Sequence, residues 1–326
     1  MTVVDPVPKL LQRVSQRLLR RHLFHLCKDP LPFRKLNCTL PGHAKSTLEE
    51  ADDFIQERLE SWGYRVEREA CLVQAFRCDV TKVKAHQYGT PRPDDRWYVA
   101  HNLYARKLGS AHPDEIILLV AHKDSQSWVD CPGAYDNAVG TVANLEIARV
   151  LARCRSRRSI WFLFCNEEHW PWTSVTAARN ARIRGDRLIA IFNTDSVGGK
   201  RQADVDAGRK TNVTGYTRPE GEPLADLMAA VNETYKLGLI QSKARRKSPG
   251  DDDGSFIKEG FPAAVINLGS IPYGDPNYHL ESDGPELVDI PNVRMATQAV
   301  LAAVVKLDGR NPGSGICNLG SGIGAP

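Results

Sequence analysis

The amino-acid sequence predicts a single α/β domain with a largely parallel central sheet and helices on both faces. Residues 115–121 (EIILLVA), 159–165 and 188–193 are continuous apolar runs of strand length, as expected of strands buried on both faces. Strands that alternate with helices are typical of a parallel sheet covered on both sides. The 326 residues suffice for one large domain of this kind.

The other elements can be assigned in chain order. After a basic N-terminal helix, Ser46 and Glu49 form a capping box for a helix that Gly63 ends. Residues 64–83 alternate weakly and indicate strands, whereas residues 138–152 have helical periodicity. We expect further helices at residues 222–237 and 291–307 and a strand at residues 263–268. The chain thus divides into an N-terminal helical arm (residues 1–45), a main domain (46–308) and a flexible Gly-rich tail (309–326).

Composition and charge are ordinary for a soluble globular protein. Hydrophobic residues make up 42% and the net charge is +4, too small and dispersed to indicate a nucleic-acid partner. No segment approaches the roughly 18 apolar residues of a membrane span, and arginines interrupt the N-terminus where a signal peptide is apolar. The eight cysteines lack CxxC spacing and are expected to be free thiols. We therefore expect a cytoplasmic location and no membrane partner, and the oligomeric state stays open.

Carboxylates and imidazoles follow the predicted strands directly. Because the carboxyl ends of parallel strands meet at one edge of a sheet, and ligands bind there, we expect these side chains to share one site. They are His122 and Asp124 after the first buried strand, Asp136 in a Gly-bounded turn, Glu167 and Glu168 after the second strand, Asp195 after the third, and His279 in the loop after the last.

The residue types at this edge favour a metal site. Two histidines with several carboxylates and no cysteine favour zinc, cobalt or manganese. Two metals about 3.5–4 Å apart and bridged by one carboxylate are a familiar hydrolytic arrangement. A single strand-end Asp is more often a helix cap, and a single His more often a surface group, but several on one edge indicate function.

Five motifs, in order and spacing, resemble the di-zinc aminopeptidases of metallopeptidase family 28. The motifs are AHKDS, GAYDNAVG, NEEH, NTDSVG and YHLESD. The resemblance extends from about residue 46 to residue 307 and includes DDDGSFIKEGFPA, which is similar to the segment before the last metal-ligand loop of that family. It implies a zinc-exopeptidase fold of the phosphorylase/hydrolase-like type, with residues 46–308 as a zinc peptidase catalytic domain. Two zinc ions per chain and a peptide or aminoacyl substrate are also implied.

The resemblance further implies a role for each site residue. Asp124 would orient His122 through its second ring nitrogen. Glu167 would take a proton from the water between the metals and pass it to the leaving amine. Tyr278 is a candidate donor to the oxyanion, with packing as its alternative role. The implied metal ligands are Asp136 as the bridge, His122 and Asp195 on one ion, and Glu168 and His279 on the other.

Some residues depart from the family pattern. Lys123 stands where members often carry an apolar or aromatic residue, and HWPWTS replaces a Gly- and Leu-rich stretch. His169 directly follows Glu168 and would point away from the metals, so we expect it to support a ligand or to lie at the surface. Trp170 and Trp172 would either wall a substrate pocket or pack against the following helix. These changes leave the ligand set intact.

Several functions compete on this ligand set. The first is an aminopeptidase, and the second is a glutaminyl-cyclase-like acyltransferase that works with one zinc. A carboxypeptidase or amidohydrolase would use the same metals, because a preference for a free amine is not visible in the motifs. A non-catalytic binding module would be expected to have lost ligands, and none is lost here. The number of metals per chain separates the first two.

Overall fold

The computed structural model describes residues 5–309, so the expected tail lies outside the described residues apart from Gly309. The strands are β1 (Val66–Ala75), β2 (Arg77–Cys78), β3 (Tyr88–Gly89), β4 (Trp97–Lys107), β5 (His112–His122), β6 (Arg158–Cys165), β7 (His169–Trp170), β8 (Arg187–Thr194), β9 (Thr211–Tyr216), β10 (Ile240–Arg245) and β11 (Ala264–Leu268). The α-helices are α1 (Val7–Gln12), α2 (Gln16–Cys27), α3 (Thr47–Ser61), α4 (Val139–Leu151), α5 (Thr173–Arg184), α6 (Gln202–Asp206), α7 (Glu222–Thr234), α8 (Asp251–Lys258) and α9 (Ile290–Gly309).

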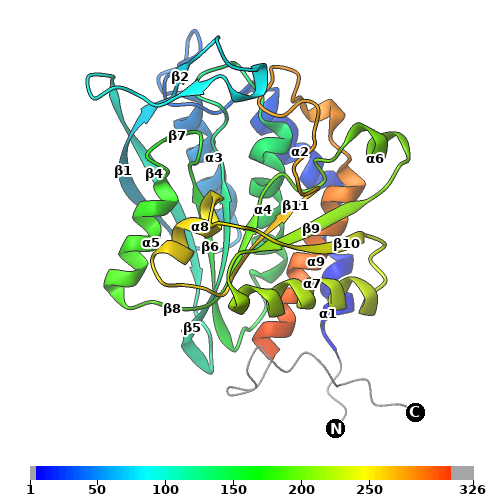
Figure 1. Cartoon of the computed structure of the whole chain (residues 1–326). Helices are drawn as coiled ribbons and strands as arrows, with labels where there is room; N and C mark the ends of the chain where they lie inside the picture. The colour runs from blue at the N-terminus through cyan, green and yellow to red at the C-terminus, as the bar shows by residue number, and fades with distance from the viewer. Residues whose placement is uncertain (1–4, 310–326) are drawn as a thin grey trace.

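A large mixed sheet forms the centre of the described chain. Its order is β10-β9-β11-β8-β5-β6-β4-β1-β7, and β2 and β3 pair as a separate hairpin (Figure 1). The central strands β11, β8, β5 and β6 run parallel, whereas β4, β1 and β7 continue the sheet as antiparallel neighbours. The predicted α/β class with a largely parallel central sheet is confirmed.

Helices cover both faces of this sheet. Along β5, Ile117 and Leu119 point into one apolar core, and Leu118 and Val120 point into the other, because successive strand side chains alternate. Residues of α1, α2, α3, α4, α7 and α9 fill the first core, and residues of α5 and α8 fill the second. In Figure 1, α5 and α8 lie in front of the sheet and α4 lies behind it.

The N-terminal helices pack into the first core. Leu19, Leu23 and Leu26 of α2 are fully buried in the cluster that contains the β5 side chains. The expected single helix is divided in two, because Ser15 caps a new helix by accepting a hydrogen bond from the backbone N–H of Leu18. This arm therefore packs against the body of the protein.

The carboxyl end of β5 is a topological switch point. The chain reaches β6 on one side of β5 through α4, and then reaches β8 on the other side through α5. Since α4 and α5 cover opposite faces of the sheet, the connections diverge and leave a crevice beyond the strand end. The predicted site residues follow the strands that meet there.

The expectations on membrane spans and on cysteines can be compared with the described residues. Within residues 5–309, no helix combines the length and the apolar character that crossing a membrane requires. Every cysteine in that range is a free thiol, as expected.

Candidate metal centre

The predicted ligands lie together beyond β5 in two overlapping groups. One potential ligand atom from each of His122, Asp136 and Asp195 lies within 4.8 Å of the others, and the same holds for Asp136, Glu168 and His279. Oδ1 of Asp136 is 3.1 Å from Nε2 of His122, and its Oδ2 is 2.9 Å from Nε2 of His279. One buried carboxylate thus presents one oxygen to each group, which is the arrangement a bridging ligand requires.

Strand register explains why distant residues meet. His122, the last residue of β5, is paired with Cys165 of β6, so the two adjacent glutamates follow beside it. On the other side Val120 is paired with Asn193 of β8, which places Asp195 just beyond the end of β5. His122, Glu168 and Asp195 therefore come from the ends of neighbouring parallel strands.

The turn that carries Asp136 is fixed by polar contacts. The buried carboxylate of Asp283 accepts hydrogen bonds from the backbone N–H groups of Tyr135 (3.0 Å) and Asp136 (3.2 Å). Asn137, joined to Asp136 by a cis peptide bond, donates to the carbonyl of Thr194 at 3.0 Å. The turn is thereby tied both to the loop after His279 and to the end of β8.

The chemistry of the donor set fits divalent metal ions of the zinc type. The donors are imidazole nitrogens and carboxylate oxygens, as in hydrolytic zinc sites. Within the described residues, two buried polar atoms at the site have no hydrogen-bond partner, namely Oε2 of Glu167 and Oε1 of Gln126. Buried polar atoms are rarely left unpaired, so these atoms point to a ligand.

Electrostatics also favour a cation in this crevice. Burial alone would lower the pKa of His279, but the neighbouring Glu168 and Asp136 raise it to about 10. Burial likewise opposes ionisation of Asp136, whereas hydrogen bonds from His122 and His279 bring its pKa below the usual value. The clustered carboxylates are thus stabilised by positive charge, which protonated imidazoles or bound metal ions supply.

Asp124 holds parts of both strand ends in place. Its buried carboxylate lies 3.3 Å from Nδ1 of His122 and 2.8 Å from Nδ1 of His169, and it accepts the backbone N–H groups of Glu167 and Glu168, each at 2.9 Å. Burial would raise the pKa of Asp124, but the hydrogen bonds from the two histidines bring it below its usual value. His169 is therefore buried and not at the surface. It supports a candidate ligand through Asp124, which is the first of the two alternatives expected for it.

Replacing Asp124 by Asn is expected to weaken zinc affinity or activity by about 10–100-fold while the fold is kept. The amide keeps the size of the side chain but loses the negative charge that orients His122. Competition of zinc-loaded protein with a chelator measures the affinity. Unchanged affinity together with an unchanged rate would mean that Asp124 is only a turn residue.

Lys123 points away from the metal groups. Its Nζ lies 2.8 Å from Oδ1 of Asp52 on α3 and 2.7 Å from Oδ1 of Asn166. Lys123 and Asp52 are both buried, so this departure from the family pattern is an ion pair that joins β5 to α3 behind the site. It does not contact the candidate ligands.

Glu167 lies beside the metal groups without belonging to either. Its pKa is raised well above the usual value, first by burial and then by the negative charges of Asp252 and Asp251. A carboxyl group with a raised pKa at the edge of a metal site is suited to accept a proton and return it. Glu168, by contrast, is within 3.4 Å of Nε2 of His279.

Sequence reasoning missed Arg34, a fully buried residue of the N-terminal arm. Its guanidinium donates to the carbonyl oxygens of Leu26 (2.7 Å), Lys123 (2.6 Å), Pro132 (2.7 Å) and Gly133 (2.8 Å). It thus ties the loop after β5 to the turn that carries the bridging candidate. No sequence signal marks it, because it stands in an irregular segment far from both loops.

Gln126 was also missed, although it follows β5 closely. Its amide nitrogen lies 2.9 Å from Oδ2 of Asp136 and 3.1 Å from Oε1 of Glu168. A further polar residue so soon after the strand was a usable signal. Gln126 therefore orients two candidate ligands.

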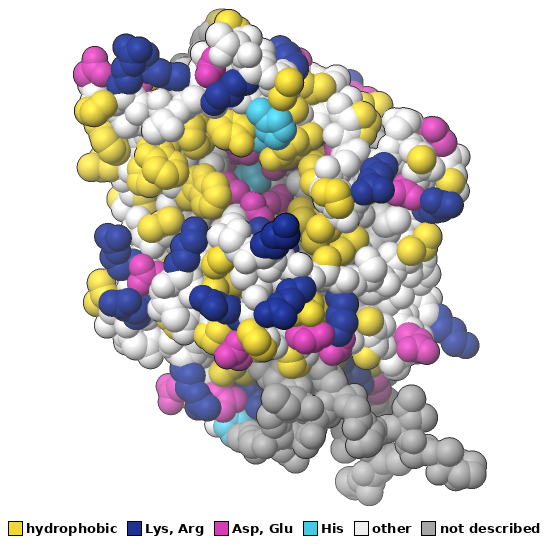
Figure 2. All heavy atoms as spheres, in the orientation of Figure 1, with side chains coloured by type: hydrophobic (Ala, Val, Ile, Leu, Met, Phe, Trp, Pro, Cys, Tyr) yellow, Lys and Arg dark blue, Asp and Glu magenta, His cyan; other side chains and the backbone are white. Residues whose placement is uncertain are grey.

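Aromatic side chains line the mouth of the crevice. Figure 2 shows a hollow with histidine and acidic side chains at its floor and hydrophobic side chains around it. The rings of Trp128 and Tyr88 meet that of His279 edge-on, with centroids 5.1 and 5.8 Å away. Phe76 joins these rings to Trp170, which is 44% exposed. Trp170 thus belongs to an aromatic rim beside the site.

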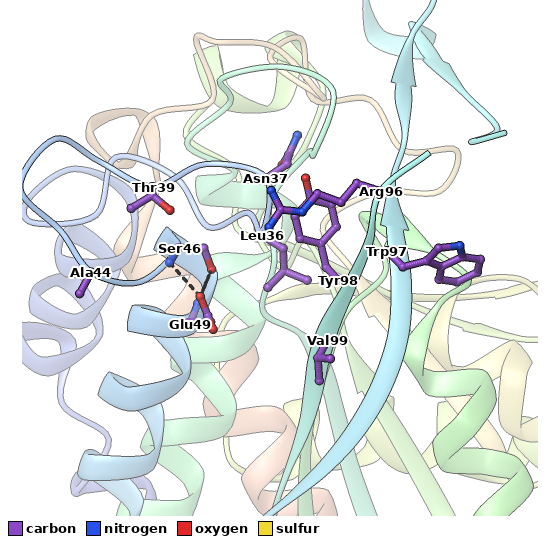
Figure 3. A pocket seen from close by; sticks show the side chains of 10 residues that line it. All are labelled: Leu36, Asn37, Thr39, Ala44, Ser46, Glu49, Arg96, Trp97, Tyr98 and Val99. Carbon is purple, nitrogen blue, oxygen red and sulfur yellow. Dashed lines mark hydrogen bonds between the residues drawn. The ribbon is translucent and has the colours of Figure 1, made fainter. Parts of the chain in front are cut away.

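A separate polar pocket of about 370 Å³ lies away from the metal groups. It is formed by the segment before α3, the start of α3 and the start of β4 (Figure 3). Ser46 and Glu49 on its wall are hydrogen-bonded to each other as the predicted capping box. None of the predicted site residues lines it.

The fold and the site define an α/β protein with two overlapping groups of candidate metal ligands at the carboxyl edge of its sheet. The family model of peptidase family M28 matches residues 102–304, more than half of the chain, and the chain belongs to this family. A probable aminopeptidase of Saccharomyces cerevisiae is 23% identical over 226 residues, which cover 66% of this chain and 59% of the relative. A probable zinc metalloprotease of Pyrenophora tritici-repentis is 28% identical, over 48% of this chain and 36% of the relative. The chain thus spans less than two thirds of the length of these relatives.

Solved structures share the fold. The LapA aminopeptidase of Legionella pneumophila has a TM-score of 0.69 at 18% identity, over 95% of this chain and 78% of its own. A glutaminyl cyclase of Bacteroides thetaiotaomicron has a TM-score of 0.67 at 16% identity, over 90% of this chain and 98% of its own. Because both enzyme types occur on this scaffold, the architecture alone does not select the reaction.

Proposed function

We propose that this protein is a metal-dependent exopeptidase, namely an aminopeptidase that removes N-terminal residues from peptides with two zinc ions bound. The observation that carries the proposal is Asp136, whose two oxygens face two buried His-carboxylate groups. Membership of peptidase family M28 and a relative named as a probable aminopeptidase support peptide hydrolysis. Residues 46–308 would form the catalytic domain, with Arg34 of the arm fixing two of its loops.

Each candidate ligand is assigned to one or both of the proposed zinc ions. His122 and Asp195 would hold one zinc ion, Glu168 and His279 the other, and Asp136 both. When bound, the two ions would lower the pKa of a shared water and polarise the scissile carbonyl group. Asp124 would keep Nε2 of His122 free for its ion by accepting a hydrogen bond from Nδ1–H.

Glu167 is the proposed general base. It would accept a proton at its unpaired, buried Oε2 and then hand that proton to the leaving amine as general acid. The charges of Asp252 and Asp251 support this role, because they raise the affinity of Glu167 for a proton. The same carboxyl group would thus serve both halves of the reaction.

Tyr278 would support His279. Its ring stacks on the imidazole with centroids 3.7 Å apart, which supports the packing role. Burial, followed by the charges of nearby carboxylates, raises its pKa well above the usual value, so the phenol stays protonated. The hydroxyl therefore remains a candidate donor to the oxyanion.

A panel of substrates tests the reaction. With zinc supplied, we expect hydrolysis of aminoacyl-4-nitroanilides that carry a free α-amine and no hydrolysis of the N-acetylated forms. Release of residues from the carboxyl end of peptides would instead identify a carboxypeptidase. Ring closure of an N-terminal glutaminyl peptide, with ammonia released, would identify the cyclase-like alternative. No turnover of any substrate would favour a binding module.

A further inference from the structure

His122 and His279 are held by different kinds of acceptor. Nδ1 of His122 meets the carboxylate of Asp124, two residues further along the chain. Nδ1 of His279 lies 2.8 Å from the carbonyl oxygen of Ala85, which is 194 residues distant. His279 also adopts a left-handed backbone conformation, with φ of 59°, which is uncommon for residues other than glycine. A contact from outside its own loop therefore helps to hold the imidazole.

Ala85 belongs to the β2–β3 hairpin (residues 77–89). A short helical turn, Lys84–His86, forms its tip. Lys84 Nζ lies 2.8 Å from Oε1 of Glu281, two residues after His279, and the ring of Tyr88 meets the imidazole edge-on. In Figure 1 the cyan hairpin lies beside the orange loop that carries His279. The β2–β3 hairpin thus contacts this loop through the main chain, a charge pair and an aromatic ring.

The base of the β2–β3 hairpin is fixed to the body of the protein. Arg77 Nε donates to Oδ2 of Asp95 at 2.6 Å, and the backbone N–H of Phe76 donates to Oγ of Ser127 at 2.9 Å. The hairpin buries little apolar surface next to its tip, because Val80 is 77% exposed and Val83 is 70% exposed. Its contacts with the His279 loop are therefore not explained by core packing.

We propose that the β2–β3 hairpin positions His279 and thereby sets the zinc affinity of the Glu168–His279 position, separately from the His122–Asp195 position. The inference rests on the proposed metal role of His279. Donation from Nδ1–H to the Ala85 carbonyl leaves Nε2 as the free ligand nitrogen and fixes the plane of the ring. The β2–β3 hairpin lies before residues 102–304, the region that the family model matches.

Shortening the β2–β3 hairpin tests this assignment. Asp79 N–H donates to the carbonyl of Gln87 at 2.7 Å, so replacing residues 80–86 by Asn-Gly leaves these two residues joined by a two-residue turn that hairpins favour. Metal-free protein is titrated with zinc against a competing chelator. One of the two dissociation constants is expected to rise by about 10–100-fold, as for loss of other groups that orient metal ligands, and the second to stay unchanged.

Two ligand variants identify the affected position. In a His279→Ala background, shortening the β2–β3 hairpin is expected to cause no further loss of affinity, because the residue it positions is gone. In a His122→Ala background, shortening the hairpin is expected to lower the affinity for the remaining zinc ion as it does in the wild-type protein. Equal weakening of both positions would overturn the proposal.

Further variants separate the carbonyl from the other contacts. Lys84→Ala removes only the exposed ion pair and is expected to leave both zinc affinities nearly unchanged. If Lys84→Ala reproduced the full loss, the Ala85 carbonyl would not be the positioning group. If the shortened protein does not fold, Ala85→Pro replaces it in the test. Proline at position 85 disfavours the helical conformation at Lys84 and should shift the tip. Ala85→Pro is expected to weaken zinc binding at one position only.

The outcomes distinguish this inference from the proposed function. A wild-type protein that binds two zinc ions, together with a folded, shortened protein of unchanged affinities, would overturn the role of the β2–β3 hairpin alone. A wild-type protein that binds no zinc would overturn both. Thermal unfolding of the metal-free forms checks that the shortened chain is folded.

Discussion

Glu167→Gln is expected to lower kcat by at least about 10²–10⁴-fold while zinc content stays near normal. The amide keeps the size and shape of Glu167 but cannot accept the proton. Glu167 lies outside both candidate ligand groups, so its loss should leave the ions in place. Measuring zinc per chain and kcat on the same preparation checks both halves of this expectation.

Glu168→Gln is the matched control from the adjacent position. Its side chain lies 3.4 Å from Nε2 of His279 and belongs to a candidate ligand group, so the neutral amide should loosen one ion. The loss of rate should track zinc occupancy and be partly relieved by excess zinc. Equal loss of metal in both variants, or an active Glu167→Gln, would refute the division of labour between the two glutamates.

Asp136→Ala is expected to remove both zinc ions and to reduce activity at least as far as Glu167→Gln, by more than about 10²-fold. Asp136 is the one residue shared by the two candidate groups, with an oxygen 3.1 Å from His122 and another 2.9 Å from His279. Losing it also leaves two histidines side by side without the carboxylate between them. Zinc content after gel filtration measures the effect.

Asp195→Ala provides the comparison for Asp136→Ala. Asp195 belongs to one candidate group only, so its loss should weaken one ion and spare the other. If Asp136→Ala kept one ion at full occupancy, or if both variants behaved alike, Asp136 would not bridge the two groups.

The parts of the fold that position the site were predictable because they follow simple patterns. β5, β6 and β8 are buried on both faces, and a strand of this kind must be an uninterrupted apolar run. Since the strands are parallel, the polar residues after each run meet at one edge. His122, Asp195 and the paired glutamates are therefore identifiable from the sequence.

Other elements lacked such a signal. β4 carries His101 and Asn102 in its interior. Asn102 is buried, and its amide donates a hydrogen bond to the carbonyl of Thr173 at 3.0 Å. A buried polar residue of this kind interrupts the apolar pattern that marks a strand. Likewise α8 begins with consecutive aspartates, of which Asp252 is buried against Cys165. Tertiary contacts outweigh local pattern at both places.

The groups that hold the candidate ligands depend even more on tertiary structure. Arg34 acts through main-chain carbonyl oxygens, and the contact of Ala85 with His279 is itself a main-chain carbonyl. A carbonyl oxygen is present at every residue, so no residue type reveals which one accepts a hydrogen bond. Only the packing of the arm and of the β2–β3 hairpin on the site identifies them.

The central claim, a carboxylate-bridged pair of zinc ions that drives peptide hydrolysis, is tested most directly by reconstitution. Protein stripped of metal with a chelator is titrated with zinc, and hydrolysis of a free-amine aminoacyl-4-nitroanilide is followed at each addition. We expect no activity without metal and full activity at close to two zinc ions per chain. Full activity of metal-free protein, or a plateau at one bound ion, would contradict the account.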